Sequence, residues 1–209
     1  MRIIKDEGAI VLTSNASFTH KLISSNQKYY KYKWIWIKNI KSNFVNAKNR
    51  PLTQYEEILV FSKGNTANGS KIKMKYYPQG IIKVNKTIKA GKNRFGTVAG
   101  KRPSHKEEFI REYTNYPSDI LEFKRDKENL HPNQKPLQLF EYLIKTYTNE
   151  QELILDNCIG SGTTAVACIN CNRNYIGFEI DKKYYYTAVN RVSELEAKRK
   201  NIGENDVSN

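Results

Sequence analysis

Several features that identify whole classes of protein are scarce in this 209-residue sequence. It has no run of 18 apolar residues and no charged segment followed by an apolar leader, so we expect a soluble, unexported protein that works in the cytoplasm. Three cysteines are too few for a disulfide framework. Cys168 and Cys171 form a lone CxxC inside a predicted helix, which favours buried thiols over a metal site.

Acidic residues are absent between Gly64 and Lys106, while the whole chain carries a net charge of +14. Basic residues in this stretch alternate with the aromatic residues Tyr76, Tyr77 and Phe95. A cluster of one sign favours a polyanion, because each neutralised phosphate releases condensed counterion. The alternative is a solvated loop in a lysine-rich chain. We expect nucleic-acid contacts from Lys71, Lys73, Lys75, Arg94, Lys101 and Arg102.

Residues 153–156 form an apolar run that ends in Asp156, which is typical of a buried parallel strand. Gly160 and Gly162 then permit a tight turn, and Thr163 or Thr164 can cap the helix that follows. This strand, turn and helix predict the first half of a nucleotide-type βαβ unit, with a ligand site at the carboxyl end of the strand.

The second half of the unit follows at once. Residues 174–180 read as another short strand, and Glu179 near its end lies 23 residues after Asp156. An acid about 20 residues beyond the glycine turn is where such folds bind ribose hydroxyls. The combination predicts a nucleoside-type cofactor site, and the alternative is a tight turn with no ligand.

The rest of the chain predicts a mixed α/β domain without internal repeats. We expect strands at 8–14, 30–38 and 58–62, a loop at 39–54 over the active face, and helices at 19–27, 137–146 and 184–200. The Gly, Asn and Pro content of the basic insertion predicts irregular structure and short strands there. Four regions follow: catalytic-half strands (1–63), the basic insertion (64–130), the cofactor-binding half (131–200) and a disordered tail (201–209).

Two motifs carry a resemblance to a known family. Residues 156–164, D-N-C-I-G-S-G-T-T, resemble the S-adenosylmethionine (SAM) loop of the amino-group DNA methyltransferases, commonly D-P-F-x-G-S-G-T-T, with Asn157 and Cys158 replacing Pro and Phe. Residues 131–136, H-P-N-Q-K-P, resemble the signature that precedes that loop in the β-type order. The resemblance spans residues 3–193. It implies a Rossmann-like α/β sheet with helices on both faces, a basic target-recognition insertion, SAM as cofactor and double-stranded DNA as substrate.

The same resemblance implies roles for individual residues. Asp156 would receive the ammonium of the methionine moiety, directly or through water, and Glu179 the ribose hydroxyls. Thr163 would bond the carboxylate, which Lys135 or backbone amides of the turn at 131–136 would also face. The cofactor contacts that it implies are Asp156, Asn157, Cys158, Gly160, Gly162, Thr163, Glu179, His131 and Lys135. No metal is implied.

The family's catalytic tetrapeptide, D/N/S-P-P-Y/F/W, occurs nowhere in these residues, so no catalytic residue is assigned. In the family its strand lies in the middle of the sheet, between the strands that correspond to 153–156 and 8–14. Without it, we expect main-chain groups there to lack partners and the tertiary structure to lose stability.

Three hypotheses remain open. The chain is an adenine-N6 or cytosine-N4 DNA methyltransferase whose true start lies upstream, or a split subunit that binds SAM or DNA and needs a partner chain for the catalytic segment. The third is a nucleotide-binding regulatory module without methyl transfer. Within the first, the W-x-W, N-A-K and E-E-I-L-V-F-S-K segments resemble adenine-specific members of restriction-modification systems more. Cytosine-C5 chemistry is excluded because no Cys follows a Pro.

Overall fold

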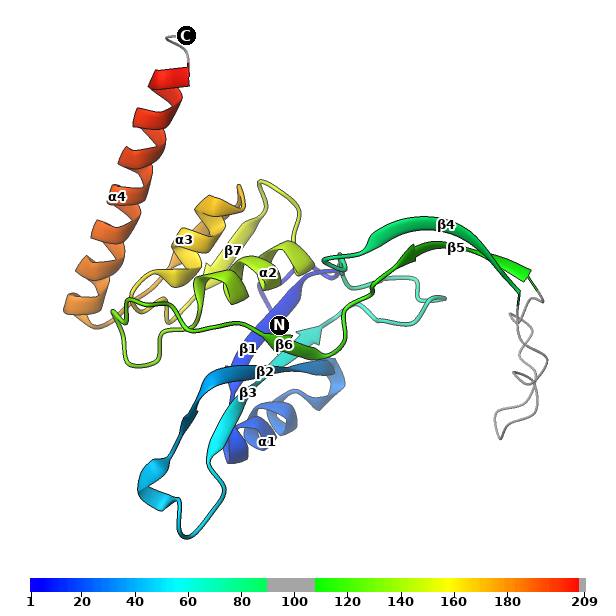
Figure 1. Cartoon of the computed structure of the whole chain (residues 1–209), viewed down its shortest axis with the longest axis horizontal. Coiled ribbons are helices and arrows are strands. Elements are labelled where there is room, and N and C mark those ends of the chain that lie inside the picture. The colour runs from blue at the N-terminus through cyan, green and yellow to red at the C-terminus, as the bar shows by residue number, and fades with distance from the viewer. Residues whose placement is uncertain (90–107, 207–209) are drawn as a thin grey trace. The chain divides into compact units, whose positions relative to one another are not determined.

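The computed structural model describes residues 1–89 and 108–206, which form two compact units (Figure 1). The larger unit comprises Met1–Tyr77 and Asp119–Asn209, and the smaller comprises Pro78–Ser118. The smaller unit lies inside the stretch predicted to be the basic insertion. Three of the predicted nucleic-acid contacts, Arg94, Lys101 and Arg102, lie outside the described residues.

A four-stranded sheet forms one half of the larger unit, in the order β1-β3-β2-β6. Its strands are β1 (Ala9–Ser14), β2 (Tyr30–Ser42), β3 (Thr53–Ser62) and β6 (Ile120–Glu122). β3 pairs antiparallel with both β1 and β2, and β6 runs parallel to β2. Strands lie where all three are predicted in the first 63 residues, but β2 extends four residues further and β3 begins five residues earlier than predicted. The loop predicted at 39–54 is therefore shorter than expected.

A second sheet contains β7 (Leu153–Asp156) and β8 (Asn174–Gly177), which are parallel and joined through helix α3 (Thr163–Asn170). The predicted βαβ unit is therefore confirmed, and β7 has the bounds that the apolar run predicts. Both strands end at the same edge of this sheet because they run parallel. The candidate cofactor residues follow that edge.

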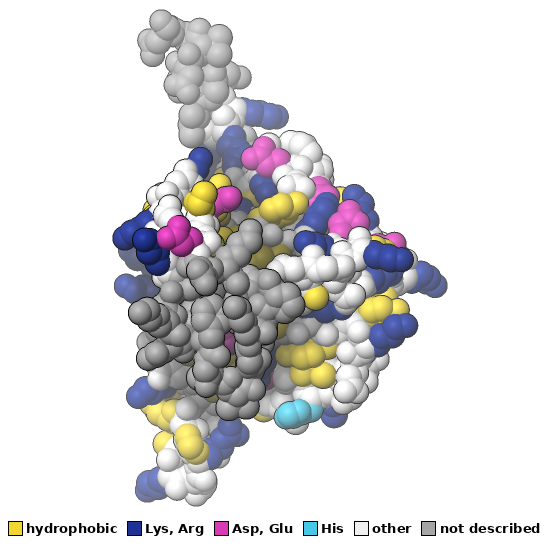
Figure 2. Space-filling view, turned by 90° about the vertical axis from the view of Figure 1, so that its right-hand side faces the viewer, with side chains coloured by type: hydrophobic (Ala, Val, Ile, Leu, Met, Phe, Trp, Pro, Cys, Tyr) yellow, Lys and Arg dark blue, Asp and Glu magenta, His cyan; other side chains and the backbone are white. Residues whose placement is uncertain are grey.

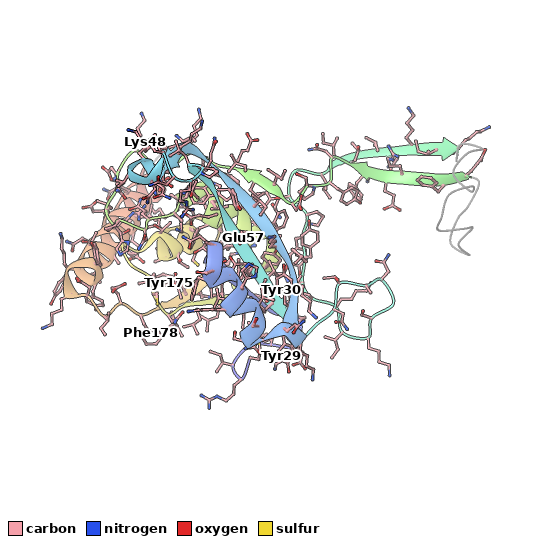
Figure 3. The ribbon with its side chains drawn as sticks, turned by 90° about the horizontal axis from the view of Figure 1, so that it is seen from below. Tyr29, Tyr30, Lys48, Glu57, Tyr175 and Phe178 are labelled. Carbon is pink, nitrogen blue, oxygen red and sulfur yellow. The ribbon has the colours of Figure 1, made fainter. Side chains whose placement is uncertain are left out.

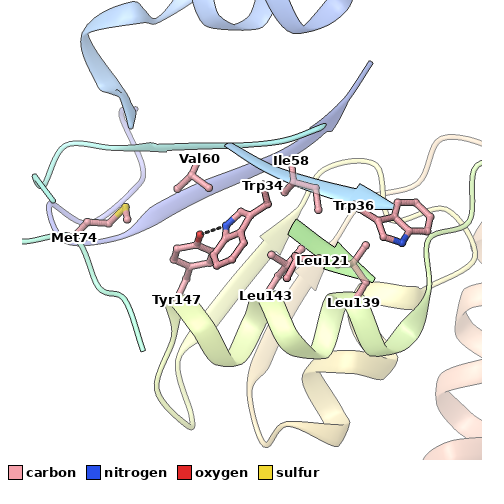
Figure 4. Close-up of a cluster of buried hydrophobic side chains, with 9 residues drawn as sticks. All are labelled: Trp34, Trp36, Ile58, Val60, Met74, Leu121, Leu139, Leu143 and Tyr147. Carbon is pink, nitrogen blue, oxygen red and sulfur yellow. Dashed lines mark hydrogen bonds between the residues drawn. The ribbon is translucent and has the colours of Figure 1, made fainter. Parts of the chain in front are cut away.

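Helix α2 (Leu137–Tyr147) packs against both sheets. Its residues Leu139, Leu143 and Tyr147 join a buried cluster with Trp34 and Trp36 of β2 (Figure 4). The Trp34 indole donates a hydrogen bond of 2.6 Å to the Tyr147 hydroxyl. Burial raises the pKa of Tyr147, so this hydroxyl stays neutral and satisfies the indole inside the core.

The two sheets are not joined by a ladder. Within the described residues, β1 pairs with β3 alone and β7 pairs with β8 alone, so one edge of each strand has no strand beside it. This arrangement is the one expected when the strand between them is absent from the chain. The uncovered face of β7 carries Leu153 and Leu155, which are 61% and 47% exposed.

The prediction of irregular structure and short strands in the basic insertion is confirmed for its described residues. Strands of eight and seven residues pair as an antiparallel hairpin with a register shift between Lys83 and Lys86, and turns and bends precede it. The prediction of a disordered tail is wrong for residues 201–206, which continue a helix, and residues 207–209 lie outside the described residues. The elements are β4 (Ile82–Lys89), β5 (Glu108–Thr114), α1 (Ala16–Ser25) and α4 (Lys182–Asp206). None of the described helices is long and apolar enough to cross a membrane.

Candidate functional site

Asp156 ends β7 and organises the turn that follows it. Its Oδ1 accepts a hydrogen bond of 3.0 Å from the Cys158 amide, and its Oδ2 accepts one of 2.5 Å from the Thr164 hydroxyl. The carboxylate therefore fixes the turn against the first turn of α3. Its proposed contact with the ammonium of a cofactor stays a prediction.

Two glycines in the turn adopt backbone conformations that L-residues rarely take. Gly160 has φ of 54° and Gly162 has φ of 83°, and a Cβ on Gly162 would lie 2.9 Å from the Cβ of Ala188 on α4. Gly162 therefore permits both the left-handed turn and the close approach of α4.

Thr163 does not cap α3, although the sequence predicts that it or Thr164 does so. The N-cap is Gly162, and no side chain caps this helix end. The Thr163 hydroxyl instead accepts a hydrogen bond of 3.2 Å from Arg191 of α4, which also donates to the Ser161 carbonyl. Arg191 was missed by the sequence analysis; its burial lowers the pKa of its guanidinium.

Glu179 lies two residues beyond β8 and reaches back to the glycine turn. Its Oε2 accepts a hydrogen bond of 2.8 Å from the Gly160 amide, and its Oε1 accepts one of 2.9 Å from the Asp181 amide. The acid and the turn, which the sequence separates by 19 residues, therefore form one site.

A cavity of about 250 Å³ opens beside this acid. Its lining consists of residues that follow β7 and β8, namely Asn157, Cys158, Phe178, Glu179 and Ile180. Phe178, which Figure 3 labels, and Ile180 precede and follow the acid in the sequence. They are 59% and 99% exposed, so they offer exposed apolar surface beside a carboxylate. The sequence analysis missed both, although their place on either side of Glu179 was a usable signal.

The turn at residues 131–136 packs against the glycine turn. The His131 ring lies 3.6 Å from where a Cβ of Gly160 would stand, and it meets the Tyr184 ring edge-on at 4.2 Å between centroids. Gln134 Oε1 accepts a hydrogen bond of 3.2 Å from the Ser161 hydroxyl, which ties the two motifs together. The structure thus brings His131 to the predicted site.

Lys135 has a different partner from the one predicted. Its Nζ lies 2.6 Å from a carboxylate oxygen of Glu56 on β3, and Lys38 Nζ lies 3.6 Å from the other oxygen. All three side chains are less than one-fifth exposed. The charge of Lys135 is therefore neutralised by a residue 79 positions earlier, and its contact with a cofactor carboxylate stays a prediction.

The three described basic residues of the predicted nucleic-acid surface divide into two groups. Lys71 and Lys73 are exposed. Lys75 is instead paired with Glu152, to which its Nζ donates a hydrogen bond, and it lies 3.7 Å from Glu7. These acids precede β7 and β1, so Lys75 holds the starts of the two strands together. Other Lys and Arg side chains project along the edges of the face in Figure 2.

The cysteines do not form a metal site. No group of three or more His, Cys, Asp and Glu side chains in the described part of the chain is arranged to hold an ion. Cys168 and Cys171 are buried, and burial raises the pKa of Cys168 to about 12, so its thiol stays protonated. Cys158 is exposed at the cavity.

A family model described as DNA methylase, of the N6/N4 methyltransferase type, matches residues 1–190. Among curated proteins, the type II methyltransferase M.HindIII of Haemophilus influenzae is 42% identical over 77 residues, which are 36% of this chain and 25% of that protein. The DNA adenine methyltransferase YhdJ of Escherichia coli is 25% identical over 199 residues, 91% of this chain and 62% of YhdJ. The chain thus matches only part of the length of these relatives.

Two solved structures share the fold. The M1.HpyAVI–SAM complex has a TM-score of 0.58 at 25% identity and covers 90% of this chain and 76% of its own. The cytosine-N4-specific PvuII DNA methyltransferase has a TM-score of 0.61 at 15% identity, covering 88% and 64%. The predicted Rossmann-like fold is confirmed, and the predicted cofactor is the one named in the M1.HpyAVI complex.

Proposed function

We propose, since this chain belongs to the N6/N4 family of DNA methylases, that it contributes the cofactor site for methyl transfer from SAM to an exocyclic amino group of DNA. The observation that carries the proposal is the carboxylate of Glu179, held by backbone amides beside the cavity and the glycine turn. Strand-end acids next to such turns suit ribose hydroxyls. The bound cofactor would supply an electrophilic methyl group.

The cavity's residues fit the nucleoside part of this cofactor. Phe178 and Ile180 offer apolar surface for a purine ring, and Glu179 retains acceptor capacity beyond its two amide bonds. His131 closes the site from the turn at 131–136, where it packs on Gly160 and Tyr184. Asp156 supplies negative charge at the carboxyl end of β7, suited to an ammonium group.

Adenine N6 is the base position that we propose. The matched DNA adenine methyltransferase YhdJ aligns with 91% of this chain, whereas the likeness to the cytosine-N4-specific enzyme concerns the fold alone. The W-x-W and N-A-K segments also resemble adenine-specific members. Mass spectrometry of DNA methylated by an active complex would distinguish N6-methyladenine from N4-methylcytosine.

Titration calorimetry with SAM tests the cofactor site directly. We expect the wild-type chain to bind SAM and Glu179→Ala to weaken binding by about 1–3 kcal/mol, because a charge-assisted pair of hydrogen bonds is lost. Glu194→Gln, an exposed acid on α4, is the matched control and should bind normally. Unchanged affinity in Glu179→Ala contradicts the role of Glu179. If the chain binds NAD or ATP tightly and does not bind SAM, a nucleotide-binding regulatory module would be favoured instead.

The second candidate is a SAM- and DNA-binding subunit that requires a catalytic strand from outside these 209 residues. It is favoured by the pairing of β1 and β7, each of which has a neighbouring strand along one edge alone in residues 1–89 and 108–206, and by the exposed Leu153 and Leu155. Lys75 bridges the acids that precede these two strands. Parallel strands are normally paired and covered on both faces. A parallel strand that ended in the catalytic tetrapeptide would occupy this place and supply the missing chemistry.

Methyl transfer from labelled SAM to mixed-sequence DNA tests the second candidate. A split subunit should bind SAM yet transfer no methyl group alone, and should gain activity when co-expressed with a segment that carries the tetrapeptide strand. Transfer by this chain alone would exclude the second candidate.

A further inference from the structure

The tip of the β2–β3 hairpin exposes large apolar side chains to solvent. Val45 is 97% exposed and Phe44 is 63% exposed, and Ile40 near the end of strand β2 is 54% exposed. These three residues lie within six positions of one another along the chain, so exposed apolar side chains are concentrated at this end of the hairpin. Such surfaces mark interaction sites more often than isolated exposed residues do.

The tip is ordered by its own hydrogen bonds. Asn43 adopts a left-handed conformation with φ of 75°, and the Asn46 side-chain amide donates to its Oδ1 at 2.9 Å. The backbone amides of Asn46 and Ala47 also donate to the carbonyls of Asn43 and Phe44. Phe44 and Val45 therefore sit on a short 3₁₀ turn with a defined shape.

The charge around this apolar tip has one sign. Lys41, Lys48 and Arg50 are all exposed. The sequence has no acidic residue between Glu7 and Glu56, so no carboxylate on α1, β2 or the hairpin loop offsets these cations. Exposed apolar side chains with cations nearby in the chain suit duplex DNA. Its stacked bases can contact the apolar groups, and the phosphates on either side can contact the cations.

The hairpin belongs to the four-stranded sheet, and the candidate site follows the strands of the other sheet, β7 and β8. Glu56, near the base of β3, pairs with Lys135 of the turn that packs on the glycine turn. Figure 3 shows Lys48 of the hairpin tip at the upper edge of the larger unit and Phe178 of the cavity at its lower edge.

We infer that the β2–β3 hairpin inserts Phe44 and Val45 between base pairs of duplex DNA, with Lys41, Lys48 and Arg50 on the flanking phosphates. This inference rests on the proposed function and deepens it. Insertion of an apolar wedge costs unstacking energy and is repaid by contact area and phosphate neutralisation.

Binding of the full chain to two labelled duplexes tests this inference by fluorescence anisotropy. One duplex is fully paired and of mixed sequence, and the other is identical except for a two-nucleotide bulge, where part of the unstacking cost is already met. We expect wild type to prefer the bulged duplex. The double variant Phe44→Ser/Val45→Ser should lose this preference and bind the bulged duplex about tenfold more weakly, equivalent to about 1.4 kcal/mol. Its salt dependence should stay unchanged.

Variants of the cations and an apolar control complete the design. Lys48→Gln/Arg50→Gln should keep the preference for the bulge and lower the slope of log affinity against log salt by about one for each charge removed. Ile3→Ser removes a side chain that is 75% exposed elsewhere and should leave both properties unchanged. Circular dichroism should show all variants folded, because the replaced side chains are exposed.

Each other outcome overturns a distinct statement. If the wild type binds DNA and the Phe44→Ser/Val45→Ser variant binds with the same affinity and preference, the insertion of these two side chains is overturned and the proposed function is not. A wild type that binds no DNA overturns the wedge together with the DNA part of the proposed function. Sedimentation that shows a dimeric wild type and a monomeric variant of unchanged DNA affinity would instead make the tip a contact between two copies.

Discussion

Lys75→Gln should destabilise the protein without affecting DNA binding. Lys75 Nζ is bound to Glu152 and lies 3.7 Å from Glu7, and its backbone amide donates to the Glu7 carbonyl at 2.9 Å. Its side chain is 20% exposed and that of Glu152 is 22% exposed. The substitution would leave the Glu152 carboxylate partly buried, with only the Asn149 amide and the more distant Lys5 beside it.

We expect the free energy of unfolding to fall by about 1–3 kcal/mol, the cost of removing one partner from a partly buried charged pair. In a chain of this size the melting temperature then drops by about 2–4 °C for each kcal/mol. Urea unfolding of Lys75→Gln at pH 7, with Lys71→Gln as the exposed control, measures the difference. A variant as stable as wild type, with a reduced salt dependence of DNA binding, would refute the clamp and restore Lys75 as a DNA contact.

The effect should also depend on pH. Burial by itself would raise the pKa of Glu152, but hydrogen bonds from Lys75 and the Asn149 amide lower it below its ordinary value. The unfolded chain then binds more protons near that ordinary value, so the stabilisation is present above it and is lost as the pH falls through the lowered pKa. The pKa of Lys75 is raised by its bond to Glu152, so its share is lost only as the pH rises through that raised value. The difference between wild type and Lys75→Gln should therefore be greatest around neutral pH and smallest in acid.

Three further predictions concern the core and the site. Tyr147→Phe removes the acceptor of a buried indole and should cost about 1–3 kcal/mol in thermal unfolding, whereas a change below about 0.5 kcal/mol would contradict that bond. Gly162→Ala should destabilise the fold by about 1–3 kcal/mol and weaken SAM binding in calorimetry. The reason is that the φ of Gly162 is 83° and that a Cβ there would lie 2.9 Å from the Cβ of Ala188. Normal stability and affinity would contradict this strain. At pH 8, iodoacetamide should label Cys158 and spare Cys168, whose pKa is raised to about 12, and SAM should slow the labelling of Cys158, as peptide mass spectrometry would show. Equal labelling of both thiols would contradict the burial of Cys168.

Local patterns determined much of this fold. The strand predicted at residues 153–156 has the same bounds as β7. A short apolar run that ends in a polar residue suits a buried parallel strand. The glycine turn and the acid at 179 also meet as predicted, because parallel strands place their carboxyl ends at one edge. Within the described residues, β1 pairs with β3 alone and β7 with β8 alone, which is the arrangement expected without the tetrapeptide strand.

Only the tertiary structure decided which charges are free to act. Lys135 and Lys75 resemble ligand-binding cations in the sequence, yet each is neutralised by an acid at least 68 positions away, Glu56 or Glu7. Pairings between distant residues follow from how strands and turns come together, and no local period or motif encodes them. The apolar wall beside Glu179 and the exposed tip of the β2–β3 hairpin emerged for the same reason, because an apolar residue's exposure depends on what the rest of the chain leaves uncovered.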